Sequence, residues 1–450
     1  MDTNKLLQTI KDRFSFRPNR NQLQELDRLV FEISRREKLS PEKIIADLPE
    51  NIRFSRLKNL LIGRRFPLAT KQEKISTHGL FLNELPKPLV DNWQPKREFK
   101  PLKILVEKEA KQSQLLKNFQ NHCSGVEIEE IKLYSDYLKK HKFALNELKK
   151  PYIFIVKERW DFLKPCPCTK YHLGCGYWIL NLGFGCPYDC SYCFLQHYTN
   201  SPGIVLPANL EDFFEQFDKF SQKIKLPIRI GTGEFCDSLA LDQIAGYSKM
   251  LIPYFQNKNV LFELKTKSTN IKNLLDLRAS KNIIISWSLS PEKLAGSEEL
   301  AAPGLNQRLQ AAQKIQAAGY SIGFHFDPII YSPTWENDYQ DLLKSLYQQL
   351  KPPLAWISLG TLRSNRRLKT VCEQRFPESN IFYGELLTGE DGKLRYPEFL
   401  RQEIYQKMAG WIRQYDSKTP VYLCMENKSL WKTLGEFDSS KKIEKYILSP

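Results

Sequence analysis

Short apolar segments alternate with amphipathic segments from about residue 177 to residue 361. The amphipathic segments, such as LEDFFEQFDKFSQKI and LNQRLQAAQKIQAAG, carry one apolar face at helical spacing. This alternation predicts βα units around a parallel sheet, and six units predict a partial (β/α)6 TIM-like barrel. A doubly wound open sheet has the same alternation and is the alternative architecture. The six predicted strands are YWILNL, PIRIGTG, NVLFELKT, NIIISWSL, YSIGFHF and LAWISLG.

The first part of the chain has a different pattern. Apolar and charged positions mix at helical spacing, and Ser40-Pro41-Glu42 is typical of a helix start. Further on, LKILVEKEA and PYIFIVKE have the pattern of strands, with a Lys-rich helical stretch between them. We therefore expect four regions: a basic helical N-terminal extension at 1–70, a linker and α/β lead-in at 71–175, the barrel at 176–435 and a tail at 436–450.

The net charge of the chain indicates what kind of molecule it could bind. The 450 residues include 67 Lys and Arg against 51 Asp and Glu, for a formal net charge of +16. Such a surface suits a polyanionic partner, although a basic soluble surface has the same composition. The start, MDTNKLLQTIKDRF, has acidic residues and no long apolar core, and no later apolar run is long enough to span a bilayer. We expect a cytoplasmic protein with no membrane partner.

Cysteines are concentrated in one part of the chain. Six of the ten lie within residues 166–193, and without a secretion signal this clustering favours metal ligation over disulfides. The segment NLGFGCPYDCSYCFLQ places Cys186, Cys190 and Cys193 in a Cys-x3-Cys-x2-Cys arrangement directly after the first barrel strand. Active sites of parallel barrels lie at this end of the strands. Three thiolates can ligate three irons of a 4Fe-4S cluster and leave the fourth iron open.

Two alternatives remain for the cysteines. The same three thiols would form a zinc site if Cys175 or His197 were the fourth ligand, and the chain would then be a non-catalytic, zinc-dependent nucleic-acid-binding module. The upstream segment KPCPCTKYHLGCGY carries Cys166, Cys168 and Cys175, either as an auxiliary metal site or as buried thiols.

The cysteine motif, with Tyr192 before its last cysteine, resembles the hallmark of radical S-adenosylmethionine (SAM) enzymes. In that superfamily SAM binds the open iron of a 4Fe-4S cluster, and one electron cleaves it to methionine and a 5'-deoxyadenosyl radical. The resemblance implies these two cofactors and an electron donor such as flavodoxin or ferredoxin. Over roughly residues 100–435 the chain resembles the spore photoproduct lyase family in CGYWILNLGFGCPYDCSYCFLQ, GTGEFCDSLALD, KTKS, SWSLSP, GFHFDPI, ISLGTLR and VYLCMENKSLW.

The family resemblance also assigns cofactor-binding residues. Gly233 and Glu234 end the second strand, where the family receives the SAM amino group, and a carboxylate suits an ammonium group. Lys267 corresponds to the lysine for the SAM carboxylate, and Ser288 to a hydroxyl at the ribose. Tyr192 is a candidate for stacking on adenine or a base. A solvated strand-end glutamate and an ordinary sheet serine are the alternatives for Glu234 and Ser288.

The sequence departs from the family where hydrogen is returned to the product. Aligned on Asp242, Cys236 lies near the position of the family's radical-relay cysteine without matching it, and Phe194 replaces the tyrosine after the last cluster cysteine. Cys236 is thus a candidate catalytic residue or a buried thiol. The resemblance implies a lyase that repairs damaged DNA; RNA, protein or a metabolite is the alternative substrate.

Overall fold

The computed structural model describes residues 3–14, 16–75, 84–89, 99–141, 143–149, 152–159, 162–168, 172–198, 201–224 and 227–448. The chain forms two compact units. Unit 1 comprises Met1–Val90, Ile330–Ser332 and Leu362–Arg401. Unit 2 comprises Asp91–Ile329, Pro333–Thr361 and Gln402–Pro450. Residues 362–401 belong to unit 1 together with the N-terminal helices.

Unit 1 is mainly helical. Ser40 caps one helix through a hydrogen bond from the Lys43 amide to its hydroxyl (3.3 Å), as the Ser-Pro-Glu pattern indicates. The N-terminal helices share an apolar core that includes Leu29 and Ile33. The elements are α1 (Thr3–Arg13), α2 (Arg20–Glu37), α3 (Pro41–Ala46), α4 (Phe54–Arg65), α5 (Ala69–Gln72), β12 (Arg363–Ser364), α16 (Arg366–Arg375), η3 (Ile381–Tyr383), β13 (Leu387–Thr388) and β14 (Leu394–Arg395), the three strands forming an antiparallel sheet.

A buried ionic network joins the two halves of unit 1. Glu32 on α2 accepts hydrogen bonds from Arg28 Nε (2.9 Å), Arg65 Nε (2.8 Å) and Lys369 Nζ on α16. Arg28 also pairs with Glu373. Burial raises the pKa of Glu32, but Lys369, Arg65 and Arg28 outweigh this effect and lower it to about 2. The carboxylate is therefore ionised and surrounded by three cations.

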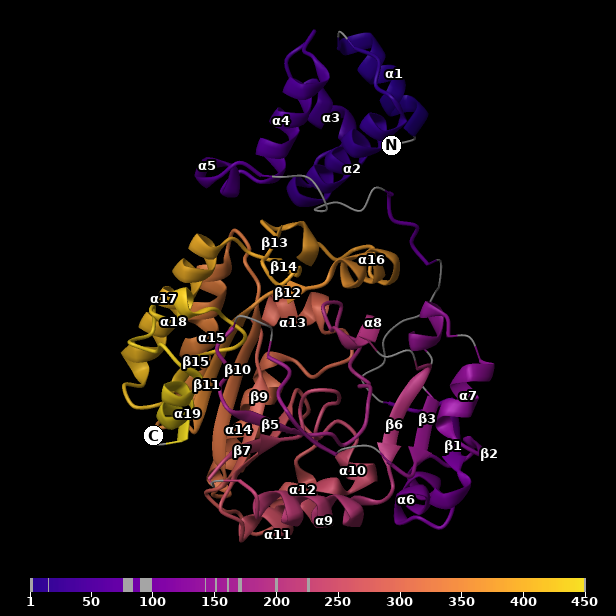
Figure 1. The fold of residues 1–450 in the computed structure, drawn as a ribbon, viewed down its shortest axis with the longest axis vertical. Coiled ribbons are helices and arrows are strands. Elements are labelled where there is room, and N and C mark those ends of the chain that lie inside the picture. Colours follow the sequence, from indigo (N-terminus) through magenta and orange to yellow (C-terminus); the bar gives the residue numbers. More distant parts are fainter. Residues whose placement is uncertain are drawn as a thin grey trace. The chain divides into compact units, whose positions relative to one another are not determined.

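Unit 2 contains the predicted barrel sheet, which curls on itself in Figure 1. Seven parallel strands carry an antiparallel strand at one edge, in the order β15-β11-β10-β9-β8-β7-β5-β4. Every residue of β9 and β11 is buried, as expected for strands covered on both faces. The partial barrel is confirmed. Its strands are β4 (Leu163–Pro165), β5 (Tyr177–Leu180), β7 (Arg229–Gly231), β8 (Leu261–Thr266), β9 (Ile283–Ser288), β10 (Ser321–Ile329), β11 (Trp356–Thr361) and β15 (Val421–Leu423).

Helices connect these strands and follow them to the C-terminus. No described helix combines the length and the apolar character needed to cross a membrane. The helices are α8 (Leu195–Tyr198), α9 (Leu210–Ser221), α10 (Asp242–Ala245), α11 (Tyr247–Gln256), α12 (Lys272–Leu275), α13 (Glu292–Glu298), α14 (Leu305–Ala317), α15 (Trp335–Gln349), α17 (Glu398–Tyr415), α18 (Lys428–Trp431) and α19 (Ser440–Leu448).

Unit 2 contains a second, four-stranded parallel sheet, in the order β2-β1-β3-β6. Two of its strands were predicted from their apolar runs. Strand β6 follows the cysteine motif in sequence, and a bridge between Phe184 and Val205 ties the motif's loop to it. The elements are β1 (Lys103–Glu107), η1 (Lys108–Ala110), α6 (Gln114–His122), β2 (Glu127–Ile131), α7 (Tyr134–Lys140), η2 (Leu145–Lys149), β3 (Tyr152–Val156) and β6 (Gly203–Pro207).

Candidate active site

The loop that carries the three motif cysteines leaves the carboxyl end of β5 and runs against β6. Gly183 and Gly185 have φ of 112° and 96°, a region that L-residues with side chains rarely adopt. A Cβ on Gly183 would lie 2.0 Å from the Val205 carbonyl oxygen. Glycine therefore allows this loop to approach β6, and the NLGFG segment places the first cysteine at the mouth of the barrel.

The three motif cysteines gather in one small cluster. Cys190 is buried with Tyr188 and three alanines, and Cys186, Tyr192 and Cys193 pack against this group. Burial raises the pKa of Cys186 and Cys190 well above the usual thiol range and that of Cys193 to about 11. Without a metal, all three are therefore neutral thiols at pH 7.

The donor set is of the kind that binds an iron-sulfur cluster. Among the described residues, no three His, Cys, Asp or Glu side chains are arranged to hold one metal ion. In a 4Fe-4S cluster each thiolate binds a different iron, so three nearby thiols need not converge on one point. The gathered thiols fit such a cluster.

A buried carboxylate, Glu299, connects the cysteine loop to the loop after β8. It accepts hydrogen bonds from the Tyr192 hydroxyl, from the Ser290 hydroxyl (2.8 Å) and from Arg308. Lys267 Nζ lies 3.7 Å from the same carboxylate. Burial raises the pKa of Glu299, but Lys267 and Arg308 outweigh it and lower the pKa to about 2. An ionised Glu299 thus holds the tyrosine of the motif and the predicted SAM lysine together.

The residue before Glu299 binds the same loop. The Ser191 amide donates to the Glu298 carbonyl (2.9 Å), and the Ser191 hydroxyl donates to the Glu298 carboxylate. Two consecutive residues of the cysteine loop, Ser191 and Tyr192, are thereby anchored by two consecutive glutamates. Glu298 is the last residue of α13 and Glu299 is the next residue. Neither belongs to a recognised motif, so no local pattern pointed to them.

The loop after β7 packs closely on β8. A Cβ on Gly233 would lie 2.4 Å from Lys265 Cβ, so glycine is required where the two strands' ends approach. Asp237 accepts hydrogen bonds from the Thr266 hydroxyl (2.5 Å) and the Lys267 amide (2.7 Å). Strand β8 ends at Thr266, and Lys267 is the next residue. Asp237, which sequence reasoning missed, therefore fixes the backbone that carries Lys267.

The other predicted site residues have distinct surroundings. Burial raises the pKa of Cys193, and the negative charge of Glu234 raises it further. Ser288 is buried at the end of β9 and pairs in register with His325. Cys236 donates its thiol hydrogen to the Thr232 carbonyl (3.5 Å), and burial raises its pKa to about 12. Cys236 thus interacts with the backbone of its own loop.

Below the mouth, the barrel interior holds a polar cluster. His325 Nε2 lies 2.7 Å from Glu263 Oε1, and Trp356 Nε1 donates to the same oxygen (3.1 Å). Burial, helped by the charge of Lys265, lowers the pKa of His325, whereas the Glu263 carboxylate opposes this shift. His325 is thus paired inside the barrel.

Comparison with known proteins identifies the family. The family model "Spore photoproduct lyase" matches residues 106–414. The spore photoproduct lyase of Clostridium acetobutylicum is 26% identical over 275 residues, which cover 59% of this chain and 80% of that protein. The Bacillus subtilis enzyme of the same name is 24% identical over 323 residues, or 69% and 91% of the two chains.

The fold also matches solved structures. A spore photoproduct lyase variant with bound AdoMet and dinucleoside spore photoproduct superposes with a TM-score of 0.62, at 23% identity, over 72% of this chain and 98% of that one. This likeness concerns the fold, including the partial barrel. The match of the family model confirms the family predicted from the cysteine motif and the strand-end segments. The chain therefore belongs to the spore photoproduct lyase family, and it is a radical SAM lyase.

Proposed function

We propose that this protein uses a 4Fe-4S cluster and SAM to repair a photoproduct in DNA. The observation that carries the proposal is the grouping of Cys186, Cys190 and Cys193 at the mouth of the barrel. Beside them lies a buried ionic hub, formed by Glu299 with Lys267 and Arg308. Two facts about relatives support the substrate: their name, spore photoproduct lyase, and the dinucleoside spore photoproduct bound in one solved structure.

The three cysteines would hold three irons of the cluster, and SAM would occupy the fourth. When bound, these cofactors supply a 5'-deoxyadenosyl radical that takes hydrogen from the substrate, once a donor such as flavodoxin or ferredoxin has provided an electron. Cluster binding removes the thiol protons, which burial otherwise retains. The surrounding apolar side chains of this site limit the access of water to the thiolates.

The chain's own residues supply a charge pattern that fits SAM. Glu234 complements the SAM ammonium group, and Gly233 leaves its backbone accessible. Lys267 complements the SAM carboxylate. Glu299 would remain neutralised by Arg308 when Lys267 turns toward SAM, because both cations now share this carboxylate. In addition, the hydroxyl of Ser288 would contact the ribose, and the ring of Tyr192 would flank the adenine.

Hydrogen return is assigned to Cys236. Its thiol lies in the loop after β7, two residues beyond Glu234, and the rise of its pKa to about 12 keeps the S–H bond intact at neutral pH. Phe194, at the position where the family has a tyrosine, is partly exposed and has no phenol to share the relay. The proposed hydrogen donor is therefore a thiol alone. The sulfur radical that remains after this transfer would return to the thiol by taking a second electron from the same electron donor and a proton from solvent.

The direct test is turnover of damaged DNA. Protein reconstituted anaerobically with iron and sulfide would be mixed with SAM, reductant and irradiated DNA, and mass spectrometry would follow 5'-deoxyadenosine and restored thymine. We expect both products, about four irons per chain, and no thymine change in matched undamaged DNA. SAM cleavage without turnover of any lesion would indicate an RNA, protein or metabolite substrate. Zinc without iron would refute the enzyme class.

A stability prediction tests the ionic hub. Glu299→Gln is expected to lower the free energy of unfolding by about 3 kcal/mol, because it leaves Arg308 and Lys267 buried or half-buried without their carboxylate. Tyr192→Phe, which removes one hydrogen bond to the same group, should cost only about 1 kcal/mol. Denaturant unfolding of the metal-free protein at neutral pH would measure both. Equal effects of the two variants would refute the ionic role of Glu299.

A further inference from the structure

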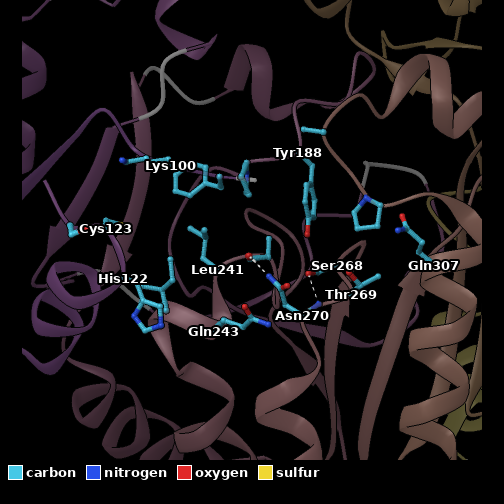
Figure 2. Close-up of a pocket in the computed structure, with 17 residues that line it drawn as sticks. Lys100, His122, Cys123, Tyr188, Leu241, Gln243, Ser268, Thr269, Asn270 and Gln307 are labelled. Atoms are coloured by element: carbon cyan, nitrogen blue, oxygen red, sulfur yellow. Dashed lines mark hydrogen bonds between the residues drawn. The ribbon is translucent and has the colours of Figure 1, made fainter. Parts of the chain in front are cut away.

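A pocket of about 580 Å³ lies in unit 2 beside the cysteine loop. Figure 2 shows two walls of the pocket, with Leu241 between them in this view. One wall carries Lys100, which lies three residues before β1, and His122, which ends α6. The opposite wall carries Tyr188 and the segment 268–270 after β8, and Gln243 lies at the bottom of the view. Its volume is in the range of sites for small ligands.

The pocket adjoins the proposed cluster site without being part of it. Tyr188, Ala240 and Ala301 line the pocket and also pack in the group that contains Cys190. The same side chains therefore face a ligand on one side and the motif cysteines on the other. A molecule in the pocket would lie next to the reaction site.

The lining has the chemistry of a nucleotide site. Among its described residues, Lys100 and His122 are basic and none is Asp or Glu. The His122 Nδ1 lies 3.0 Å from the Asn118 carbonyl, which occupies one ring nitrogen and leaves Nε2 for another partner. Hydroxyl and amide groups complete the lining. Cations with N–H and O–H donors suit a phosphate.

The amide side chains on the other side of the pocket suit a base. Asn270 Nδ2 donates to the Ala240 carbonyl (2.9 Å), which fixes the side chain and leaves its amide oxygen as an acceptor (Figure 2). Gln243 is exposed and offers both a donor and an acceptor. Paired donors and acceptors of this kind recognise the edges of bases.

We propose that this pocket binds one nucleotide of the DNA strand next to the lesion, with its phosphate at Lys100 and His122 and its base at Gln243 and Asn270. This inference rests on the proposed function and adds a substrate subsite to it. Holding a neighbouring nucleotide out of the base stack would fix the position of the lesion at the barrel mouth. Enzymes that act on a nucleobase in DNA extrude the target nucleotide from the stack, and this pocket would hold the nucleotide next to it.

The test uses the full-length, cluster-free protein and a fluorescein-labelled, undamaged single-stranded oligothymidylate, with binding followed by anisotropy at several salt concentrations. Lys100→Ala is expected to weaken binding about three- to tenfold and to reduce the magnitude of the log-log salt slope by about 0.7, the value of one phosphate contact. Gln243→Ala should weaken binding without changing the slope, because it removes an uncharged contact. Lys108→Ala removes an exposed lysine outside the pocket and should change neither quantity.

Wild-type affinity and salt slope in Lys100→Ala would overturn the proposal, as would an equal loss in Lys108→Ala. Wild-type affinity in Gln243→Ala would overturn the base contact. A separate assay measures SAM cleavage by the cluster-loaded protein without DNA. It distinguishes failure of the pocket proposal from failure of the proposed function. Lys108→Ala should cleave SAM like the wild type. A wild-type protein that cannot cleave SAM would refute the proposed chemistry, whether or not it binds the oligonucleotide.

Discussion

Replacing Cys190 with alanine is expected to abolish reductive cleavage of SAM, and the same result is expected for Cys186 and Cys193. Each thiolate would bind a different iron, so the loss of any one leaves an iron without its protein ligand. Chromatography of 5'-deoxyadenosine after anaerobic reaction with reductant would measure the effect, and iron analysis would show whether the cluster is incomplete. Full 5'-deoxyadenosine production by all three variants would refute the cluster assignment.

Two other cysteines provide the matched controls. Cys372 lies buried on α16 in unit 1, and Cys424 follows β15 in unit 2. Neither belongs to the group formed by the motif cysteines. Cys372→Ala and Cys424→Ala are therefore expected to keep SAM cleavage and iron content. Circular dichroism of all five variants separates loss of the cluster from loss of the fold.

Replacing Glu32 with alanine is expected to destabilise unit 1 by about 3–5 kcal/mol, because Arg28, Arg65 and Lys369 would remain buried without their shared carboxylate. Hydrogen exchange of peptides from α2 and α4, read by mass spectrometry, would report on this unit by itself. Glu25→Ala is the control: it breaks a surface pair with Lys58 (2.7 Å) that should contribute no more than about 1 kcal/mol. Equal protection of α2 in both variants would contradict the prediction.

The same carboxylate predicts a pH dependence. Its folded pKa, about 2, is below the usual 4.5, so Glu32 binds a proton more readily in the unfolded chain. Its contribution to stability is fully present above the unfolded pKa and is lost as pH falls from about 4.5 towards 2. At 1.36 kcal/mol per unit, the amount is on the order of 3 kcal/mol. The free energy of unfolding of Glu32→Ala should therefore fall less than that of the wild type between pH 4.5 and pH 2.

The barrel was predictable because its strands are buried on both faces. Strand β9 is a nearly continuous apolar run, and such runs between amphipathic helices specify a parallel sheet. Strand β2 lies at the edge of the smaller sheet, and in its sequence EIEEI only Ile131 is buried. Because most of its residues are polar, the hydrophobic pattern did not predict this strand. The pairing of Glu32 with Lys369 has no local signal, because the two residues are 337 positions apart.

The site was predictable only where its chemistry depends on local spacing. The Cys-x3-Cys-x2-Cys motif is contained within eight residues, and these three thiols do lie together. Asp237 lies in the loop after β7 and Glu299 directly after α13, and a single carboxylate at such a position has no distinctive pattern. The direction of the Cys236 side chain depends on the conformation of the turn from Thr232 to Cys236. The sequence around this turn has no pattern that specifies that conformation.

The make-up of unit 1 has a consequence for synthesis of the chain. The helices α1–α5 leave the ribosome before the barrel strands, whereas Lys369 follows Glu32 by 337 residues. At about 5–20 residues per second, this delay is roughly 20–70 s. The early helices carry most of their own apolar core, and Glu32 has Arg28 and Arg65 as partners in the meantime. All barrel strands up to β11 emerge during this interval. Unit 1 thus begins to fold before the barrel, and it is completed only after the barrel strands up to β11 have been synthesised.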